Sequence, residues 1–129
     1  MSVVDEITVY LKKEGLKFQK RKGTLTIFYP DLEIQLVLKI DESSRKAVLS
    51  LDYDVELRDH IADLFDSGED VEDIIDTAIS EIRDIAVNIS NILESKGYSI
   101  EDKISEGEKD IRDLMEEVLE EYEEYSELE

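Results

Sequence analysis

Apolar and polar residues alternate with a period of two through most of the first half of the chain. Turn signals at Lys22-Gly23 and Pro30-Asp31 and a polar loop after residue 40 separate the alternating runs. Strict alternation with short turns is typical of antiparallel strands that bury one face. We therefore predict a four-stranded antiparallel β-meander with strands at 16–21, 24–29, 32–40 and 47–55.

A helix is expected before the meander. Val4, Ile7 and Leu11 recur at helical spacing, Ser2 is a suitable N-cap, and Gly15 fits a C-terminal stop.

From residue 55 onward the apolar period is helical. The pattern predicts a short helix at about 55–66, a long helix at about 69–96, and a final helix that starts at Ser99 and reaches about residue 125. The expected fold class is α+β: an N-terminal helix, the meander, then three helices including a long helical hairpin. We expect a single domain over 1–129, with helix and meander in 1–55 and an acidic helical part in 56–129.

The long helix poses a problem of coverage. At 1.5 Å per residue it would be roughly 40 Å long, and its apolar stripe runs along its whole length. The final helix could fold back on it as an antiparallel partner, and a second copy of the chain could cover the rest. We therefore predict a homodimer. The expected helix-packing or dimer face comprises Ile75, Ile82, Ile85, Ile89, Ile92, Leu114, Val118 and Tyr122.

The last fourteen residues, EEVLEEYEEYSELE, look at first like a disordered acidic tail. Val118, Leu119, Tyr122 and Tyr125 nevertheless keep the helical spacing, and acidic tails lack such an apolar period. This segment is therefore predicted to be helical and to dock on the long helix, with its glutamates facing solvent.

Composition narrows the class of protein. Apolar residues make up 41% of the 129 positions, and there is no cysteine for a disulfide or a thiolate site. The N-terminus lacks the features of a signal peptide, and no apolar run is long enough to cross a bilayer, so a cytoplasmic location without membrane association is expected. The richness in Glu and Lys follows a trend of thermophilic proteins, although an AT-rich genome gives a similar bias.

Charge divides the chain into two halves. The net charge is −20, yet residues 1–53 hold 9 Lys/Arg and 8 Asp/Glu, whereas residues 54–129 hold 6 and 27. Such a field repels nucleic acid and attracts basic partners. We therefore expect a non-enzymatic acidic protein-interaction module, adaptor-like or chaperone-like, with a basic protein partner. The alternative is a nucleic-acid-mimicking inhibitor of viral or plasmid type, whose carboxylate rows at 56–73 and 106–129 would imitate phosphates.

A metal-dependent enzyme is the third hypothesis. Glu56, His60 and Asp63 would share one face of a helix and could offer two carboxylates and an imidazole to a metal ion. The competing interpretation is a surface histidine on an acidic helix. Because no nucleophile motif or phosphate-binding glycine loop accompanies the trio, we expect no cofactor and no catalytic residue.

One basic cluster stands out in the first half, and Phe18 lies within it. Cations around an aromatic side chain can bind nucleic acid, but the net charge of −20 opposes direct binding of phosphate. Docking on the acidic helices, within one chain or between two, is the favoured interpretation. The candidate partner-binding residues are Lys12, Lys13, Lys17, Lys20, Arg21 and Lys22.

Overall fold

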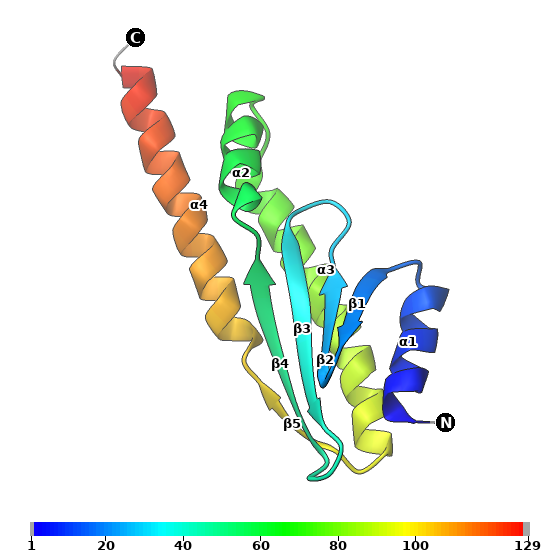
Figure 1. The fold of residues 1–129 in the computed structure, drawn as a ribbon. Coiled ribbons are helices and arrows are strands. Elements are labelled where there is room, and N and C mark those ends of the chain that lie inside the picture. The colour runs from blue at the N-terminus through cyan, green and yellow to red at the C-terminus, as the bar shows by residue number, and fades with distance from the viewer. Residues whose placement is uncertain (1, 128–129) are drawn as a thin grey trace.

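The computed structural model describes residues 2–127, which form four helices and one five-stranded sheet (Figure 1). The strands are adjacent in chain order, β1-β2-β3-β4-β5; the first four are antiparallel and β5 runs parallel to β4. The elements are α1 (Val3–Lys13), β1 (Lys17–Arg21), β2 (Thr24–Phe28), β3 (Ile34–Asp41), β4 (Lys46–Tyr53), α2 (Glu56–Asp66), α3 (Val71–Ser95), β5 (Ser99–Asp102) and α4 (Ile104–Glu127).

The expected α+β class and N-terminal helix are confirmed, but the four-stranded meander is incomplete. Residues 99–102, expected to begin the last helix, instead form β5. The cause is the open edge of β4: the Ser99 N–H donates to the Arg45 carbonyl at 3.0 Å, and the Lys103 N–H donates to that of Leu49 at 2.7 Å. The side chain of Asp102 then accepts from the Ile104 N–H at 2.9 Å, and α4 begins there.

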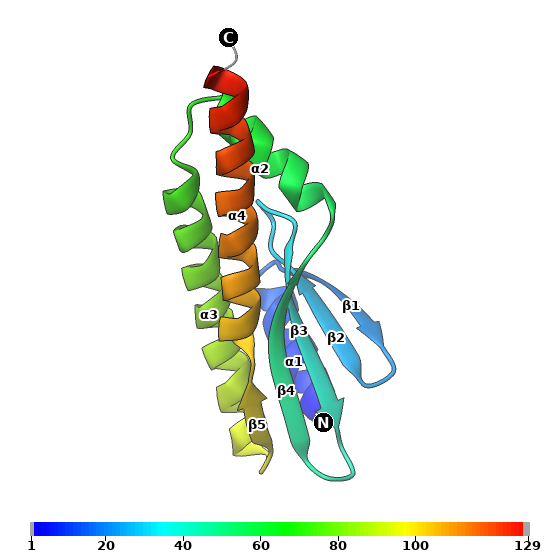
Figure 2. The same ribbon diagram turned by 90° about the vertical axis from the view of Figure 1, so that its left-hand side faces the viewer.

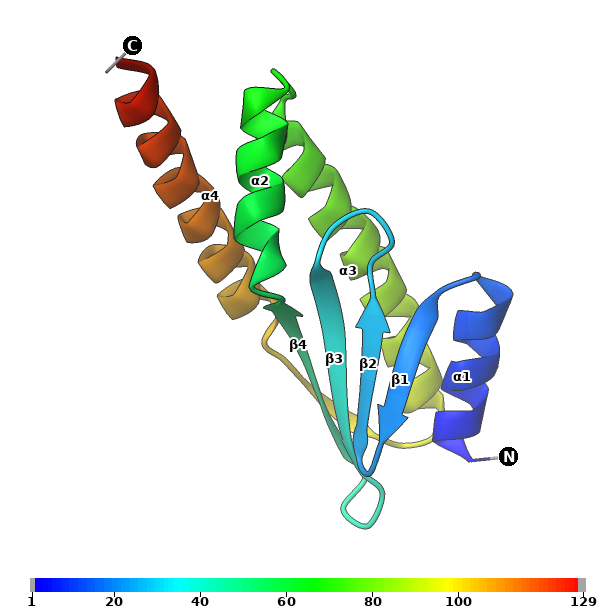
Figure 3. The same ribbon diagram turned by 45° about the horizontal axis from the view of Figure 1, so that its top comes forward.

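Helices α3 and α4 lie on one side of the sheet and α2 lies beyond its end (Figure 2), and α3 crosses behind β1 and β2 (Figure 3). The alternation of apolar residues along the strands sends their inward side chains into this layer. Cross-strand rows such as Leu25–Leu38–Leu49 and Ile27–Leu36–Leu51 are buried. No helix of residues 2–127 covers the other face, where half-exposed Thr and Ser side chains accompany Val37.

Val55 is an exception to the predicted burial of one face of the fourth strand. We expected it to continue the buried face of the fourth strand, but 85% of it is exposed. The chain leaves the sheet after Tyr53, and Val55 adopts helical dihedral angles as the N-cap of α2. The alternation rule stops applying where the strand stops.

Helix α3 holds the core together along its length. Ile75, Ile82 and Ile89 are at most 2% exposed, which confirms the apolar stripe that the sequence predicts. The Lys96 ammonium, just past the end of α3, lies 3.2 Å from the Glu6 carboxylate and so ties α3 to α1.

Helix α4 departs from the predicted helical hairpin. It runs antiparallel to α3, but it packs mainly on β4 and α2 (Figure 1). The rings of Tyr122 and Phe65 of α2 stack with centroids 5.9 Å apart, and Val118 is buried. Tyr125, expected on the apolar face, is 67% exposed. Because β5 intervenes between the two helices, α4 starts beside β4, and its end docks on α2 instead of on the long helix.

Gly107 allows the close approach of α4 to β4. A Cβ atom at this position would lie 2.5 Å from the Leu51 carbonyl oxygen and 2.6 Å from the Leu51 Cβ, distances that real Cβ atoms do not show. A glycine inside a helix is ordinarily a weakness, because Ala is the better helix former. Here the missing side chain makes room for the backbone of the neighbouring strand.

Gly107→Ala should therefore destabilise the fold, although Gly→Ala in an ordinary helix interior stabilises it by about 1 kcal/mol. The added methyl group must push α4 away from Leu51, at a cost of about 1–3 kcal/mol. Chemical denaturation of both proteins measures the difference. Lys109→Ala, an exposed change in the same helix, should stay within about 0.5 kcal/mol of the parent. A stabilised Gly107→Ala protein would contradict the close contact.

Truncation after Glu117 should lower stability by about 2–4 kcal/mol, because it removes the buried Val118 and the ring stacked on Phe65. Truncation after Tyr125 keeps both and serves as the matched control, with a thermal midpoint near that of the full chain. If the shorter protein kept full stability, the end of α4 would be a dispensable tail.

Candidate binding surfaces

Arginine side chains fasten α4 to α2 and α3. From α2, the Arg58 guanidinium pairs with Glu121 and lies 3.5 Å from a Glu117 carboxylate oxygen. From α3, Arg83 donates to Glu108 at 3.3 Å and to the Ser105 hydroxyl at 3.1 Å. These contacts hold an acidic helix against two other acidic helices.

Arg112 completes this set from α4 itself. Its Nη1 lies 2.7 Å from the Asp76 carboxylate of α3, and its Nε lies 3.5 Å from Glu108, one turn earlier on α4. The hydrogen bond to Asp76 is the main cause that raises the pKa of Arg112. Glu108 thus accepts from Arg83 and Arg112 together, and one carboxylate neutralises part of both cations.

Most acids of α2 and α4 are exposed, and we call the exposed ones the acidic face; Glu117 and Glu121 belong to it although they also pair with Arg58. Helix α4 carries 11 Asp and Glu residues against only Lys109 and Arg112, so the arginine contacts leave most of its charge uncompensated. Helices α2 and α4 lie side by side (Figures 1 and 2). The exposed members are Glu56, Asp59, Asp63, Asp66, Glu106, Asp110, Asp113, Glu116, Glu117, Glu120, Glu121, Glu123 and Glu124.

The proposed metal trio is not assembled into a site. His60 turns to Glu33 of the β2–β3 loop, with its Nδ1 2.9 Å and 3.1 Å from the two carboxylate oxygens. Glu56 and Asp63 belong to the acidic face. Within residues 2–127, no three His, Cys, Asp or Glu side chains come together in a way that could hold a metal ion. The His60–Glu33 pair gives the histidine a structural role, because it links α2 to the sheet through the β2–β3 loop.

We expect Mn²⁺, Zn²⁺ and EDTA each to leave the thermal midpoint of the protein unchanged, because His60 already has a carboxylate partner. Differential scanning fluorimetry at low ionic strength measures this. A metal-induced rise that His60→Ala abolishes and Glu33→Gln preserves would restore the metal-site hypothesis.

In the part of the chain that the structure describes, three side chains have displaced pKa values, and each shift has a local cause. Partial burial, followed by its 2.5 Å hydrogen bond to Glu81 of α3, raises the pKa of Tyr29. Hydrogen bonds from Ser43 and Ser44 lower the pKa of Asp41 in the β3–β4 turn. Together with Arg112, these groups serve turns and helix contacts.

The six residues of the basic cluster are all exposed, and the fold separates them. Lys12 and Lys13 lie in the last turn of α1, and Lys17 begins β1. In residues 2–127 none of the six forms an ion pair with the acidic helices, so docking within one chain is not seen. Docking between two chains stays a prediction.

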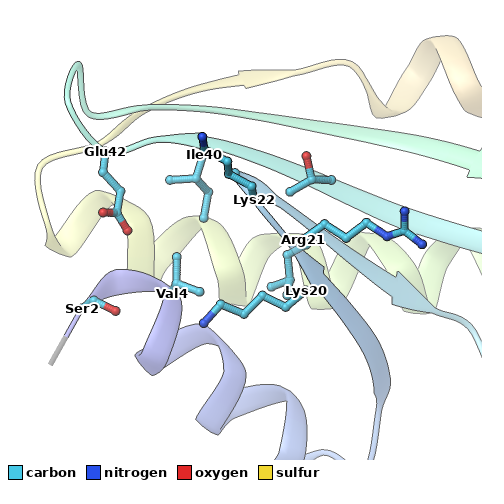
Figure 4. Close-up of a pocket in the computed structure, with 10 residues that line it drawn as sticks. Ser2, Val4, Lys20, Arg21, Lys22, Ile40 and Glu42 are labelled. Atoms are coloured by element: carbon cyan, nitrogen blue, oxygen red, sulfur yellow. The ribbon is translucent and has the colours of Figure 1, made fainter.

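The rest of the cluster lines a pocket of about 550 Å³ between α1 and the β1–β2 hairpin (Figure 4). Lys20, Arg21 and Lys22 contribute to its lining, with Val4 and Ile40 beside them. The cations can be read from the sequence, but the cavity cannot, because it depends on the angle between α1 and β1. The one available signal was the position of Lys20 at an inward-facing place in β1.

The predicted helix-packing or dimer face is used inside a single chain. Its members on α3 and α4 contact the sheet, α1 and α2, so the packing role has a structural explanation without a second copy. The homodimer stays a prediction. Five of the eight residues are buried and three are half-buried: Ile75, Ile82, Ile89, Leu114 and Val118, then Ile85, Ile92 and Tyr122.

The chain matches no protein-family model, and searches of curated proteins and of solved structures also return no match. In the part of the chain that the structure describes, none of the helices combines the length and apolar character needed to cross a membrane. A functional proposal for this protein therefore depends on its own geometry and charge.

Proposed function

We propose that this protein is a non-enzymatic interaction module of the cytoplasm that binds a basic protein partner through its acidic face. The observation that carries the proposal is the concentration of uncompensated carboxylates on two adjacent helices, α2 and α4. A positively charged polypeptide is the complementary partner, and steering by this field would speed its encounter with the protein.

The charge distribution is costly for an isolated protein. Like charges at a spacing of three or four residues on a helix repel one another and destabilise it by about 0.2–0.5 kcal/mol per pair. Glu106, Asp110 and Asp113 follow this spacing, as do Glu117, Glu120 and Glu124. A basic partner would relieve the repulsion, so the same residues that weaken the free helix favour the complex.

The acidic face is also held in place before binding. The arginine contacts at Arg58, Arg83 and Arg112 and the close approach at Gly107 fix α4 against the body of the protein. A carboxylate array on a docked helix loses less conformational entropy on binding than the same residues would in a disordered tail. This order supports recognition of a particular partner over loose attraction of any cation.

Mimicry of nucleic acid is the second candidate, and the regularity of the row on α4 favours it. Carboxylates recur at every turn of a 24-residue helix, a rise of about 5 Å between successive members. A basic surface built to follow a phosphate backbone could accept such a row. In that case the partner would itself be a nucleic-acid-binding protein, and the acidic face would occupy its binding site.

Neutralising part of the acidic face should weaken binding of a Lys/Arg-rich peptide. We expect Glu116→Gln, Glu120→Gln and Glu124→Gln together to raise the Kd about tenfold in isothermal titration calorimetry at physiological salt, since each exposed contact contributes about 0.2–1 kcal/mol. The control removes the same charge elsewhere with Glu14→Gln, Asp84→Asn and Glu94→Gln, all exposed on or beside α1 and α3. It should change the Kd by less than about threefold.

Equal losses in the two triple variants would mean that only net charge matters, and the acidic face would not be a binding site. A partner captured from the native source distinguishes the two candidates. If a DNA or RNA duplex competes with the protein for that partner, mimicry is supported; if the partner binds no nucleic acid, the adaptor role is supported.

A further inference from the structure

The pocket between α1 and the β1–β2 hairpin has a composition unlike the rest of the molecule. We call it the wedge pocket. Its volume of about 550 Å³ is within the range of small-molecule sites in proteins. The side chains that define it for the argument below are the apolar Val4, Leu25 and Ile40 and the charged Lys20, Lys22 and Glu42 (Figure 4).

The pocket exists because α1 and β1 diverge. A short turn through Glu14 and Gly15 joins the end of α1 to the start of β1, and Leu16 packs against the core there. From this turn the helix and the strand separate, so that the N-cap Ser2 and Val4 in the first turn of α1 lie across a gap from the hairpin (Figure 4).

Lys20 lies at a strand position that faces the helix-covered side of the sheet, where the neighbouring strands place core residues. It pairs with Leu25, which pairs with Leu38, which in turn pairs with Leu49, so all four side chains belong to the row on the helix-covered face. Figure 4 shows its side chain extending from β1 toward the first turn of α1. Inward-pointing lysines can protect an edge strand from aggregation. Here the ammonium also borders a cavity with an apolar wall.

The other charged side chains place charges of both signs around the pocket. Lys22 adds a second ammonium from the hairpin turn, and Glu42 opposes them from the end of β3. Arg21 contributes to the lining, but its guanidinium points away from the cavity in Figure 4. Cations at the rim over an apolar wall match a ligand with an anionic head and an apolar body.

We propose that the wedge pocket binds a small amphipathic anion, a carboxylate, sulfonate or phosphate on an aromatic or aliphatic group. The apolar group lies against Val4, Leu25 and Ile40, and the anionic group accepts hydrogen bonds from the ammonium groups of Lys20 and Lys22. Glu42 weakens the binding of anions and so selects against ligands that carry several negative charges. The site is on the β1 edge of the sheet, away from α2 and α4, and does not depend on the proposed binding of a basic protein.

The test uses anilinonaphthalene sulfonate, a fluorescent amphipathic anion, with the full chain in its folded state. We expect one bound probe per chain. Lys20→Gln with Lys22→Gln should raise the Kd about tenfold, because each lost charge-assisted hydrogen bond weakens the anion's site. Glu42→Gln should change affinity in the opposite direction and lower the Kd severalfold. The neutral analogue N-phenylnaphthylamine should bind equally to the parent and to all these variants.

The matched control is Lys12→Gln with Lys13→Gln, which removes two lysines of the same basic cluster that do not line the pocket. It should leave the Kd within about twofold, since exposed charges beyond a Debye length are largely screened. Val4→Trp should abolish binding by filling the cavity without changing any charge. The two lysine pairs keep the test decisive if Val4→Trp fails to fold. Equal effects from these pairs, or a Kd that Glu42→Gln does not lower, would overturn the proposal.

Discussion

The contact between the backbone of α4 and β4 at Gly107 determines where the acidic half of the chain lies. A side chain at this position would collide with Leu51, so only glycine allows the first turns of α4 to rest on the strand. β5 makes this possible, because it leads the chain along the open edge of β4 and delivers it to the start of α4. From there the helix extends past the end of the sheet to reach α2. This approach sets where α4 begins on the sheet, and the arginine contacts then hold the rest of the helix in place.

Arginine and lysine have different tasks in this structure. Residues 54–129 contain three arginines, and all of them join acidic helices to one another. The planar guanidinium can donate to two carboxylates at once, as Arg112 does with Asp76 and Glu108, which a lysine ammonium does with less defined geometry. The lysines of the basic cluster, in contrast, remain at the surface. Three fixed cations are therefore enough to dock a helix that is otherwise almost wholly acidic.

Periodicity predicted the elements that a local rule can describe. The alternation in β2, β3 and β4 and the helical stripe of α3 come from each element's need to bury one face, and these were confirmed. β5 was missed because its four residues carry too little pattern, and only the free edge of β4 makes them a strand. Helix propensity alone marks Gly107 as an unfavourable residue. It suits this fold because the neighbouring strand leaves no room for a side chain. Tertiary contacts, which the sequence pattern does not show, determine both the strand at β5 and the role of Gly107.

The proposed binding surfaces also differ in how much of each the sequence predicts. The sequence predicts the acidic rows and the basic cluster, because charge needs no fold to be counted. It does not predict that His60 meets Glu33 of a distant loop, or that α1 and β1 separate to leave the wedge pocket. The two surfaces border opposite edges of a five-stranded sheet. The wedge pocket lies between α1 and the β1–β2 hairpin, whereas α4 packs on β4 and α2, so the two surfaces belong to different parts of the fold (Figure 1). At physiological salt, screening limits the reach of the field of the acidic face, so a net charge of −20 is compatible with the proposed anion site.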